Sequence, residues 1–168
     1  MAEEDRDPRG RLTKLVADST CEAMRIVTHQ DVNGENRLFG GRLMEWIDEL
    51  AGIAARRQCG ASVTTACVDT LTFRQPALLN DIVVIVARVT YVGRTSLEVR
   101  VDSYVEDTST GIHSDINSAY LTEVCVNSDG QPTPVTYGLR LVSTAEKDEW
   151  EAAQKRIAVR KQRKAEGF

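Results

Sequence analysis

The sequence contains few of the residues from which many catalytic and metal sites are built. Its 168 residues include only two histidines, His29 and His113, and four cysteines that are far apart and form no CxxC motif. A zinc site with Cys and His ligands, or a Ser-His-Asp triad, therefore has little to draw on. We expect no metal site and four reduced, structural cysteines.

The sequence also lacks the features of a membrane-spanning, secreted or nucleic-acid-binding protein. No apolar run approaches the ~18 residues that a membrane helix needs, and no apolar segment follows the charged, mostly acidic start to serve as a secretory signal. The net charge of −4 gives no overall attraction to nucleic acid. We therefore predict a cytoplasmic protein that binds neither nucleic acid nor membrane.

What is present is the composition of one globular domain, with 42% hydrophobic and 27% charged residues. We predict a charged, flexible tail over residues 1–18, a folded domain over residues 19–142 and a charged helix over residues 143–168. That helix opens with a capping box formed by Ser143 and Glu146, and its acids precede its bases, which suits the helix dipole. We interpret it as a solvated surface helix, and a dedicated binding element is the alternative.

The pattern between the two ends predicts one strand, one long helix and four more strands. Residues 19–32 indicate a strand that leads into a polar loop, and residues 41–58 indicate a helix that Gly60 ends. Four later segments rich in β-branched residues indicate an antiparallel meander: 62–73, 81–92, 95–105 and 115–126. A long apolar helix lying across one curved sheet would bury both apolar faces, so we predict an α+β fold.

The long helix carries one acid outside its polar edge. At ~100° per residue, the other charges fall in one sector: Arg42, Glu45, Glu49 and Arg56. Asp48 instead falls beside Gly41, Gly52 and Ala55, a stripe of small residues that lets another backbone or a ligand come close, and we expect its carboxylate to be partly desolvated there. Asp48 is therefore a candidate catalytic residue. A structural ion pair with Arg37 or with a strand arginine is the alternative.

The same helix begins at a glycine pair, Gly40 and Gly41. The first N–H groups of a helix are unpaired and could stabilise an oxyanion, although a glycine pair is equally suited to a tight entry turn. Asp48 lies seven residues beyond Gly41, or ~10 Å along the axis, which is too far for both to act on one carbonyl carbon. If both act in catalysis, the site is shared between two chains, and a symmetric dimer has two such sites.

These motifs resemble those of the hotdog-fold acyl-CoA thioesterases, of the bacterial type and of the mammalian cytosolic and brain type. The resemblance rests on the pattern Asn33-x-x-x-Arg37-Leu38-Phe39-Gly40-Gly41 and on LMEWIDELAG at residues 43–52. It continues through VTTACVDTLTFRQPALLNDIV (63–83), VGRTSLEVRV (92–101) and the charged C-terminal helix. It thus covers most of the chain from about residue 20 onward.

The resemblance implies a hotdog fold, in which a curved antiparallel β-sheet wraps a long central helix and chains assemble as dimers and commonly as homohexamers, trimers of dimers. It implies hydrolysis of fatty acyl-CoA to free fatty acid and CoA. Asp48 and Asn33 would be the catalytic pair, supplied by different subunits. Asp48 would act as general base or as nucleophile, Asn33 would position the water or the carbonyl, and N–H groups near Gly41 would stabilise the oxyanion. No cofactor is implied, because CoA is part of the substrate and product.

The phosphates of CoA would need a local cation in this acidic protein. Arg94, Thr95 and Ser96, at a predicted hairpin turn, resemble the segment that the family uses, and a turn without a binding role is the alternative. Asn36 and Asn80 stand where many relatives have glycine. Asparagine tolerates left-handed conformations, so we expect both turns to be preserved.

Asp69 is a further acid of interest, because it lies on an otherwise largely apolar face of a predicted strand. Asp69 is predicted to share a strand face with Val63, Cys67, Leu71 and Phe73. We interpret it as a structural hydrogen-bonding residue near the site rather than as a catalytic one.

Two other functions compete with hydrolysis. Hotdog hydratases and dehydratases usually rely on a histidine at the helix or its approach, whereas no histidine lies on this helix. A non-catalytic acyl-CoA-binding sensor would usually carry a DNA-binding segment and lack the acid. We therefore predict a thioesterase, with the sensor as the alternative.

Overall fold

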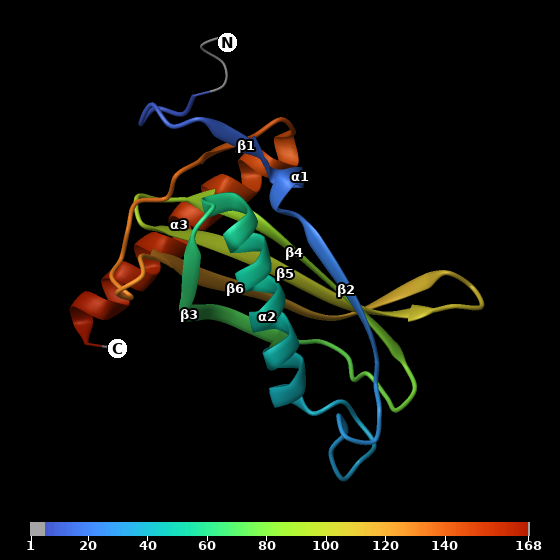
Figure 1. The fold of residues 1–168 in the computed structure, drawn as a ribbon. Coiled ribbons are helices and arrows are strands. Elements are labelled where there is room, and N and C mark those ends of the chain that lie inside the picture. Colours follow the sequence, from blue (N-terminus) through green and yellow to red (C-terminus); the bar gives the residue numbers. More distant parts are fainter. Residues whose placement is uncertain (1–5, 168) are drawn as a thin grey trace.

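The computed structural model describes residues 6–167 and contains a five-stranded antiparallel sheet, a small two-stranded sheet and three helices (Figure 1). The large sheet has the strand order β2-β4-β5-β6-β3. Its strands are β2 (Cys21–Ile26), β3 (Ser62–Phe73), β4 (Ile82–Val92), β5 (Ser96–Asp107) and β6 (Ile112–Val126). The helices are α1 (Val16–Ser19), α2 (Gly40–Cys59) and α3 (Thr144–Glu166). The predicted α+β architecture is confirmed.

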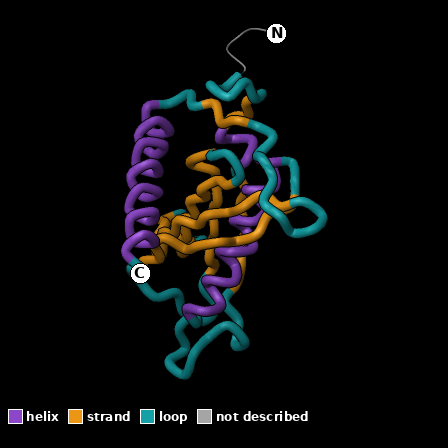
Figure 2. Tube along the Cα trace, turned by 90° about the vertical axis from the view of Figure 1, so that its left-hand side faces the viewer, coloured by secondary structure: helices purple, strands orange, loops and turns teal. Residues whose placement is uncertain are grey.

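The sheet lies between the two long helices, with α2 on one face and α3 on the other (Figure 2). The apolar face of α2 is buried, and its residues are Leu43, Trp46, Ile47, Leu50, Ala51 and Ala54. They pack against inward-facing side chains of the central strands, such as Val99 and Leu121. Among the described helices, none has both the length and the apolarity needed to cross a bilayer.

Three special backbone positions confirm expectations from the sequence. Gly60 follows the last turn of α2 in the left-handed conformation, with a φ of 67°. Asn36 and Asn80 also have positive φ angles, 55° and 70°. Asparagine therefore adopts the conformation that glycine would supply at these turns.

The N-terminal segment differs from its prediction as a flexible tail. Residues 1–5 lie outside the described residues, but Thr13–Leu15 form β1, which pairs in parallel with β7 (Gly138–Arg140). In α1, which follows, Val16 is buried in the core. The prediction of flexibility is wrong for this part, because the partner of β1 lies near the other end of the sequence and no local pattern reveals it.

The C-terminal helix is more than a solvated surface element. Its Arg156 donates two hydrogen bonds to Glu98 of β5, whose side chain is 1% exposed, and stacks 3.7 Å from the ring centroid of Tyr120. Its Glu149 pairs with Arg100 at 2.6 Å. Arginine stems and planar guanidinium groups can cover apolar surface while they pair with acids, so charged residues attach α3 to the sheet.

Two bulges change the face that Asp69 occupies. The register between β3 and β6 shifts between Thr65 and Cys67 and again between Val68 and Thr70. A bulge inserts one residue and so moves the following side chains to the opposite face. Asp69 therefore pairs with Arg160 of α3 on the outer face. The predicted shared face with Val63 is therefore wrong, whereas the predicted role of Asp69 as a structural hydrogen-bonding residue is confirmed by its contacts with Thr122 and Arg160.

Candidate active site

Asp48 lies midway along α2, beside the edge strand β3. Its Oδ1 accepts a hydrogen bond from the Thr65 hydroxyl at 2.6 Å. Within residues 6–167, neither Arg37 nor a strand arginine forms an ion pair with Asp48, so the structural alternative finds no support. The side chain of Asp48 is exposed, contrary to the expected partial desolvation. Only a second molecule on this side of α2 would desolvate it.

A second carboxyl group lies behind the same threonine. Glu123 of β6 is directly opposite Thr65 in the sheet register, and its Oε1 is 3.0 Å from the Thr65 hydroxyl. The Glu123 side chain is fully buried, with 0% exposure. This burial raises the pKa of the Glu123 carboxyl above its ordinary value, although the Thr65 hydrogen bond acts in the opposite direction, and the negative charge of Asp48 raises it further.

Sequence reasoning missed both Thr65 and Glu123. Thr65 stands in a run of β-branched residues, where a threonine is explained by strand propensity alone. Glu123 did leave a signal, because it alternates with Leu121 and Cys125 on the apolar face of its strand. An acid at an inward position of a core strand is unusual and indicates a hydrogen-bonded or functional group.

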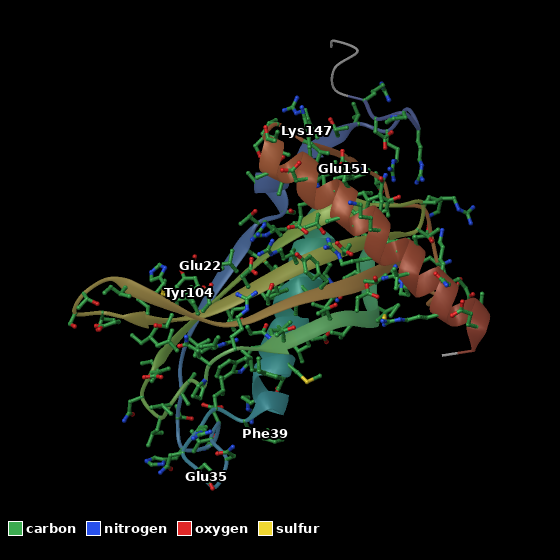
Figure 3. The ribbon with its side chains drawn as sticks, turned by 180° about the vertical axis from the view of Figure 1, so that it is seen from behind. Glu22, Glu35, Phe39, Tyr104, Lys147 and Glu151 are labelled. Atoms are coloured by element: carbon green, nitrogen blue, oxygen red, sulfur yellow. The ribbon has the colours of Figure 1, made fainter. Side chains whose placement is uncertain are left out.

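The side chain of Asn33 shapes the loop before α2. Its Oδ1 accepts hydrogen bonds from the backbone N–H groups of Glu35 and Arg37, at 2.9 and 3.2 Å. The side-chain amide is exposed, and within the described part of the chain its Nδ2 donates no hydrogen bond. Asn33 can therefore offer a ligand two N–H donors. Figure 3 shows Glu35 and Phe39 together at the end of the molecule far from Lys147.

The glycine pair at the start of α2 is packed by aromatic rings. A Cβ atom on Gly41 would lie 2.6 Å from a ring carbon of Phe39, and one on Gly40 would lie 3.3 Å from the ring of Phe73. Among the residues that the structure describes, no side chain caps this helix N-terminus, and Arg42 is the first residue of the turn to donate to the Phe39 carbonyl. The earlier N–H groups are thus positioned as donors at the positive end of the helix dipole.

Asp48 and Asn33 line different grooves of a single chain. The groove at Asp48, of about 490 Å³, is also lined by Gly52, Thr65 and Glu123. Asn33 lines a second groove with Gly40 and Phe73, of about 340 Å³. A Cβ on Gly52 would meet no atom within 4 Å, so the groove beside Asp48 is open.

The predicted CoA-binding residues form the turn between β4 and β5. The carbonyl groups of Arg94, Thr95 and Ser96 accept backbone hydrogen bonds that fix the turn, and the Arg94 side chain is exposed. In the described chain, no hydrogen bond or ion pair joins this turn to Asp48 or Asn33. The same residues 6–167 contain no group of three or more His, Cys, Asp or Glu side chains arranged to hold a metal ion, and no disulfide.

Within residues 6–167, no strand pairs with the outer edge of the sheet next to Asp48. β3 is the last strand in the order of the sheet, is 12 residues long and exposes Val68 and Phe73 to 43% and 52%. A long edge strand with apolar side chains is a template for pairing with another strand. Because Thr65 of β3 lines the Asp48 groove, a strand that paired with this edge would lie beside the groove.

Comparison with known proteins gives a consistent result. The Thioesterase superfamily matches residues 35–112. The "Uncharacterized acyl-CoA thioester hydrolase YkhA" of Bacillus subtilis is 38% identical over 73% of this chain and 72% of its own length. An acyl-CoA hydrolase of Staphylococcus aureus, solved with butyryl-CoA, CoA and CoA disulfide, is 36% identical with a TM-score of 0.86, covering 92% of this chain and 93% of that one. An apo-hexameric acyl-CoA thioesterase is 32% identical, with a TM-score of 0.86 over 91% and 97% of the two chains.

The predicted hotdog fold is confirmed by these structural matches. The Staphylococcus aureus enzyme has also been solved as three single variants, in which an aspartate, an asparagine or a threonine is replaced by alanine. These are the residue types of Asp48, Asn33 and Thr65.

Proposed function

The chain belongs to the thioesterase superfamily, among the acyl-CoA thioester hydrolases, and from that premise we propose that it hydrolyses fatty acyl-CoA to a free fatty acid and CoA. The observation that carries the proposal is the exposed Asp48 carboxylate, which a hydrogen bond from Thr65 orients in an open groove beside an unpaired strand edge. Relatives named as hydrolases, and a structural neighbour that binds butyryl-CoA, support the substrate class.

The geometry supports different chemical roles for Asp48, Asn33 and the N–H groups near Gly41. As a general base, Asp48 takes a proton from water while the hydroxide attacks the thioester carbonyl carbon, and the carbon–sulfur bond then breaks to release CoA, whose thiolate takes the proton back. As a nucleophile, Asp48 instead attacks the carbonyl carbon, and the carbon–sulfur bond breaks to release the CoA thiolate and leave a transient anhydride. Water then opens the anhydride to give the fatty acid and the Asp48 carboxylate, and the thiolate takes up the proton that is released. In either case the free Nδ2 of Asn33 and the N–H groups near Gly41 hold the oxyanion. The reaction needs no cofactor.

Pairing of two chains through β3 would bring the two halves of the site together. A symmetric pair joins identical edges, so the two β3 strands would run antiparallel. The Thr65 end of one strand, with Asp48 beside it, would then lie next to the Phe73 end of the other. Phe73 contacts Gly40 and shares a groove with Asn33. Each site would therefore take Asp48 from one chain and Asn33 from its partner.

Larger assembly, phosphate binding and location complete the proposal. A hexamer is supported by the hexameric thioesterase that this chain resembles.

The exposed guanidinium of Arg94, with the hydroxyl groups of Thr95 and Ser96, would bind a CoA phosphate. A cytoplasmic location is supported by the similarity to the cytosolic acyl coenzyme A thioester hydrolase of Rattus norvegicus, and cell fractionation tests it.

The proposal is tested by measuring release of free CoA thiol from acyl-CoAs of increasing chain length. The wild type should hydrolyse some of them, and Asp48→Ala and Asn33→Ala should each lose most of the turnover while they keep the native fold and assembly. Glu151→Ala, which removes an exposed acid on α3 that does not line the Asp48 groove, should stay active. A wild type that binds acyl-CoA without releasing thiol establishes the sensor instead.

A further inference from the structure

The Thr65 hydroxyl is in contact with two carboxyl groups, and it cannot donate a hydrogen bond to both of them. Its Oγ1 is 2.6 Å from Asp48 Oδ1 and 3.0 Å from Glu123 Oε1, and both distances are within hydrogen-bond range. A threonine hydroxyl has one hydrogen to donate and can otherwise only accept. If both carboxyl groups were ionised, one of the two contacts would be a repulsion between oxygens. One of the two acids must therefore carry a proton.

The surroundings decide which acid carries it. Glu123 is 0% exposed, and within residues 6–167 it forms no ion pair, while its Oε2 has no hydrogen-bond partner. Asp48 is exposed to water and can remain ionised. An ionised carboxylate without a paired cation is far more costly to bury than a neutral carboxylic acid.

The charged and titratable groups around Glu123 agree with this assignment. From α2 it faces the Asp48 carboxylate, which disfavours a second negative charge, and Arg56, an exposed cation that favours one. Cys125 is on its own strand, and across the sheet β5 presents the apolar side chain of Leu97. Burial raises the pKa of the Glu123 carboxyl, and the opposing charge of Arg56 is exposed to water, which screens it.

We propose that Glu123 is a positioning residue for the proposed thioesterase reaction: as a neutral carboxylic acid it donates to Thr65, and Thr65 in turn donates to the Asp48 carboxylate. The chain of donors runs one way, from the core to the groove. It fixes the Asp48 Oδ1 atom and leaves its other oxygen free for water or substrate. Loss of the proton from Glu123 reverses the chain, because Thr65 then donates to Glu123 and Asp48 loses its donor.

The inference rests on the proposed function, and three variants test it. Glu123→Gln replaces the donor O–H with an amide N–H of similar shape and should retain most of the wild-type kcat. Glu123→Leu removes the donor and should lower kcat by about tenfold, the effect of one lost hydrogen bond of ~1.4 kcal/mol. In a Thr65→Val background, Glu123→Leu should have little further effect, because Glu123 acts only through Thr65.

The pH profile separates positioning from mere support of the fold. Wild-type kcat should decline on the alkaline side as Glu123 ionises, and this decline should be absent from Glu123→Gln, which cannot ionise. A Glu123→Gln variant as impaired as Glu123→Leu would overturn the proposal, because an ionised carboxylate would then be required. Wild-type kcat in Glu123→Leu, or additive losses in the double variant, would overturn it as well.

A measurement independent of activity separates this inference from the proposed function. At pH 7, the infrared spectrum of the wild type should contain the carbonyl stretch of a protonated carboxylic acid. The spectrum of Asp48→Asn should retain this band, and the spectrum of Glu123→Gln should lack it. Absence of that band from the wild type overturns the inference even if the enzyme is active. The band together with a wild type that releases no thiol supports the neutral Glu123 while it removes the proposed reaction. The spectra decide the protonation even if Glu123→Leu fails to fold.

Discussion

Replacing Thr65 by valine tests whether the hydroxyl that joins the two acids contributes to catalysis. Valine has nearly the same shape and suits a strand at least as well, so β3 should keep its pairing with β6. The substitution removes the 2.6 Å hydrogen bond to the ionised Asp48. A hydrogen bond to a charged group contributes about 1.5–3 kcal/mol, which corresponds to a loss of about 10- to 150-fold in kcat/KM if Asp48 needs it in the transition state.

The assay is thiol release at saturating and limiting acyl-CoA, with unfolding curves to confirm the fold. Thr64→Val is a matched control, because it makes the same chemical change one residue away, where the side chain points to the other face of the strand. Thr65→Val should lose activity and Thr64→Val should not. Activity of Thr65→Val within about twofold of the wild type, less than ~0.5 kcal/mol, would refute the argument that Thr65 orients Asp48.

Three further predictions concern stability. Arg156→Ala leaves the buried Glu98 without its cation and should lower the unfolding free energy in urea by about 3 kcal/mol; a loss below about 1 kcal/mol contradicts a structural role for this pair. Burial of Glu149 opposes its ionisation, but hydrogen bonds from Arg100 and Arg156 lower its pKa. Its contribution to the unfolding free energy is therefore present above the unfolded pKa of ~4.3 and is lost as pH falls through the lower folded pKa. Glu149→Gln should flatten the dependence of stability on pH in that window, and a pH dependence equal to that of the wild type would contradict the prediction. Asn80→Ala should cost about 1 kcal/mol at its positive φ angle and Asn80→Gly almost nothing, as thermal unfolding would show, and equal stability of the two variants would contradict the backbone argument.

Local sequence patterns were sufficient for the two long helices and for the strands of the large sheet, but not for β1, α1 and β7. The apolar stripe of α2, its end at Gly60 and the left-handed turns at Asn36 and Asn80 each depend on neighbouring residues, and the structure has all of them. The bulges of β3 were not predictable in this way, because they depend on the register with β6. They explain why the predicted face of Asp69 was wrong.

The candidate site divides in the same manner. Asp48 is prominent in the sequence because it lies outside the polar edge of its helix. The periodicity that defines this edge can be read from the helix segment alone. Thr65 and Glu123 acquire meaning only when β3 and β6 pair and α2 crosses them, which brings together three segments far apart in the sequence. The docking of α3 through Arg156 and Glu98 was missed for the same reason.

Subunit complementation tests the site shared between chains most directly. Asp48→Ala and Asn33→Ala, each inactive alone, are mixed under conditions that exchange subunits, and thiol release is measured. Random exchange makes half of the dimers mixed, and each mixed dimer has one intact Asp48–Asn33 site, so activity should recover to about a quarter of the wild type. No recovery, with exchange confirmed by mass, would show that each chain carries its own complete site and would contradict the account.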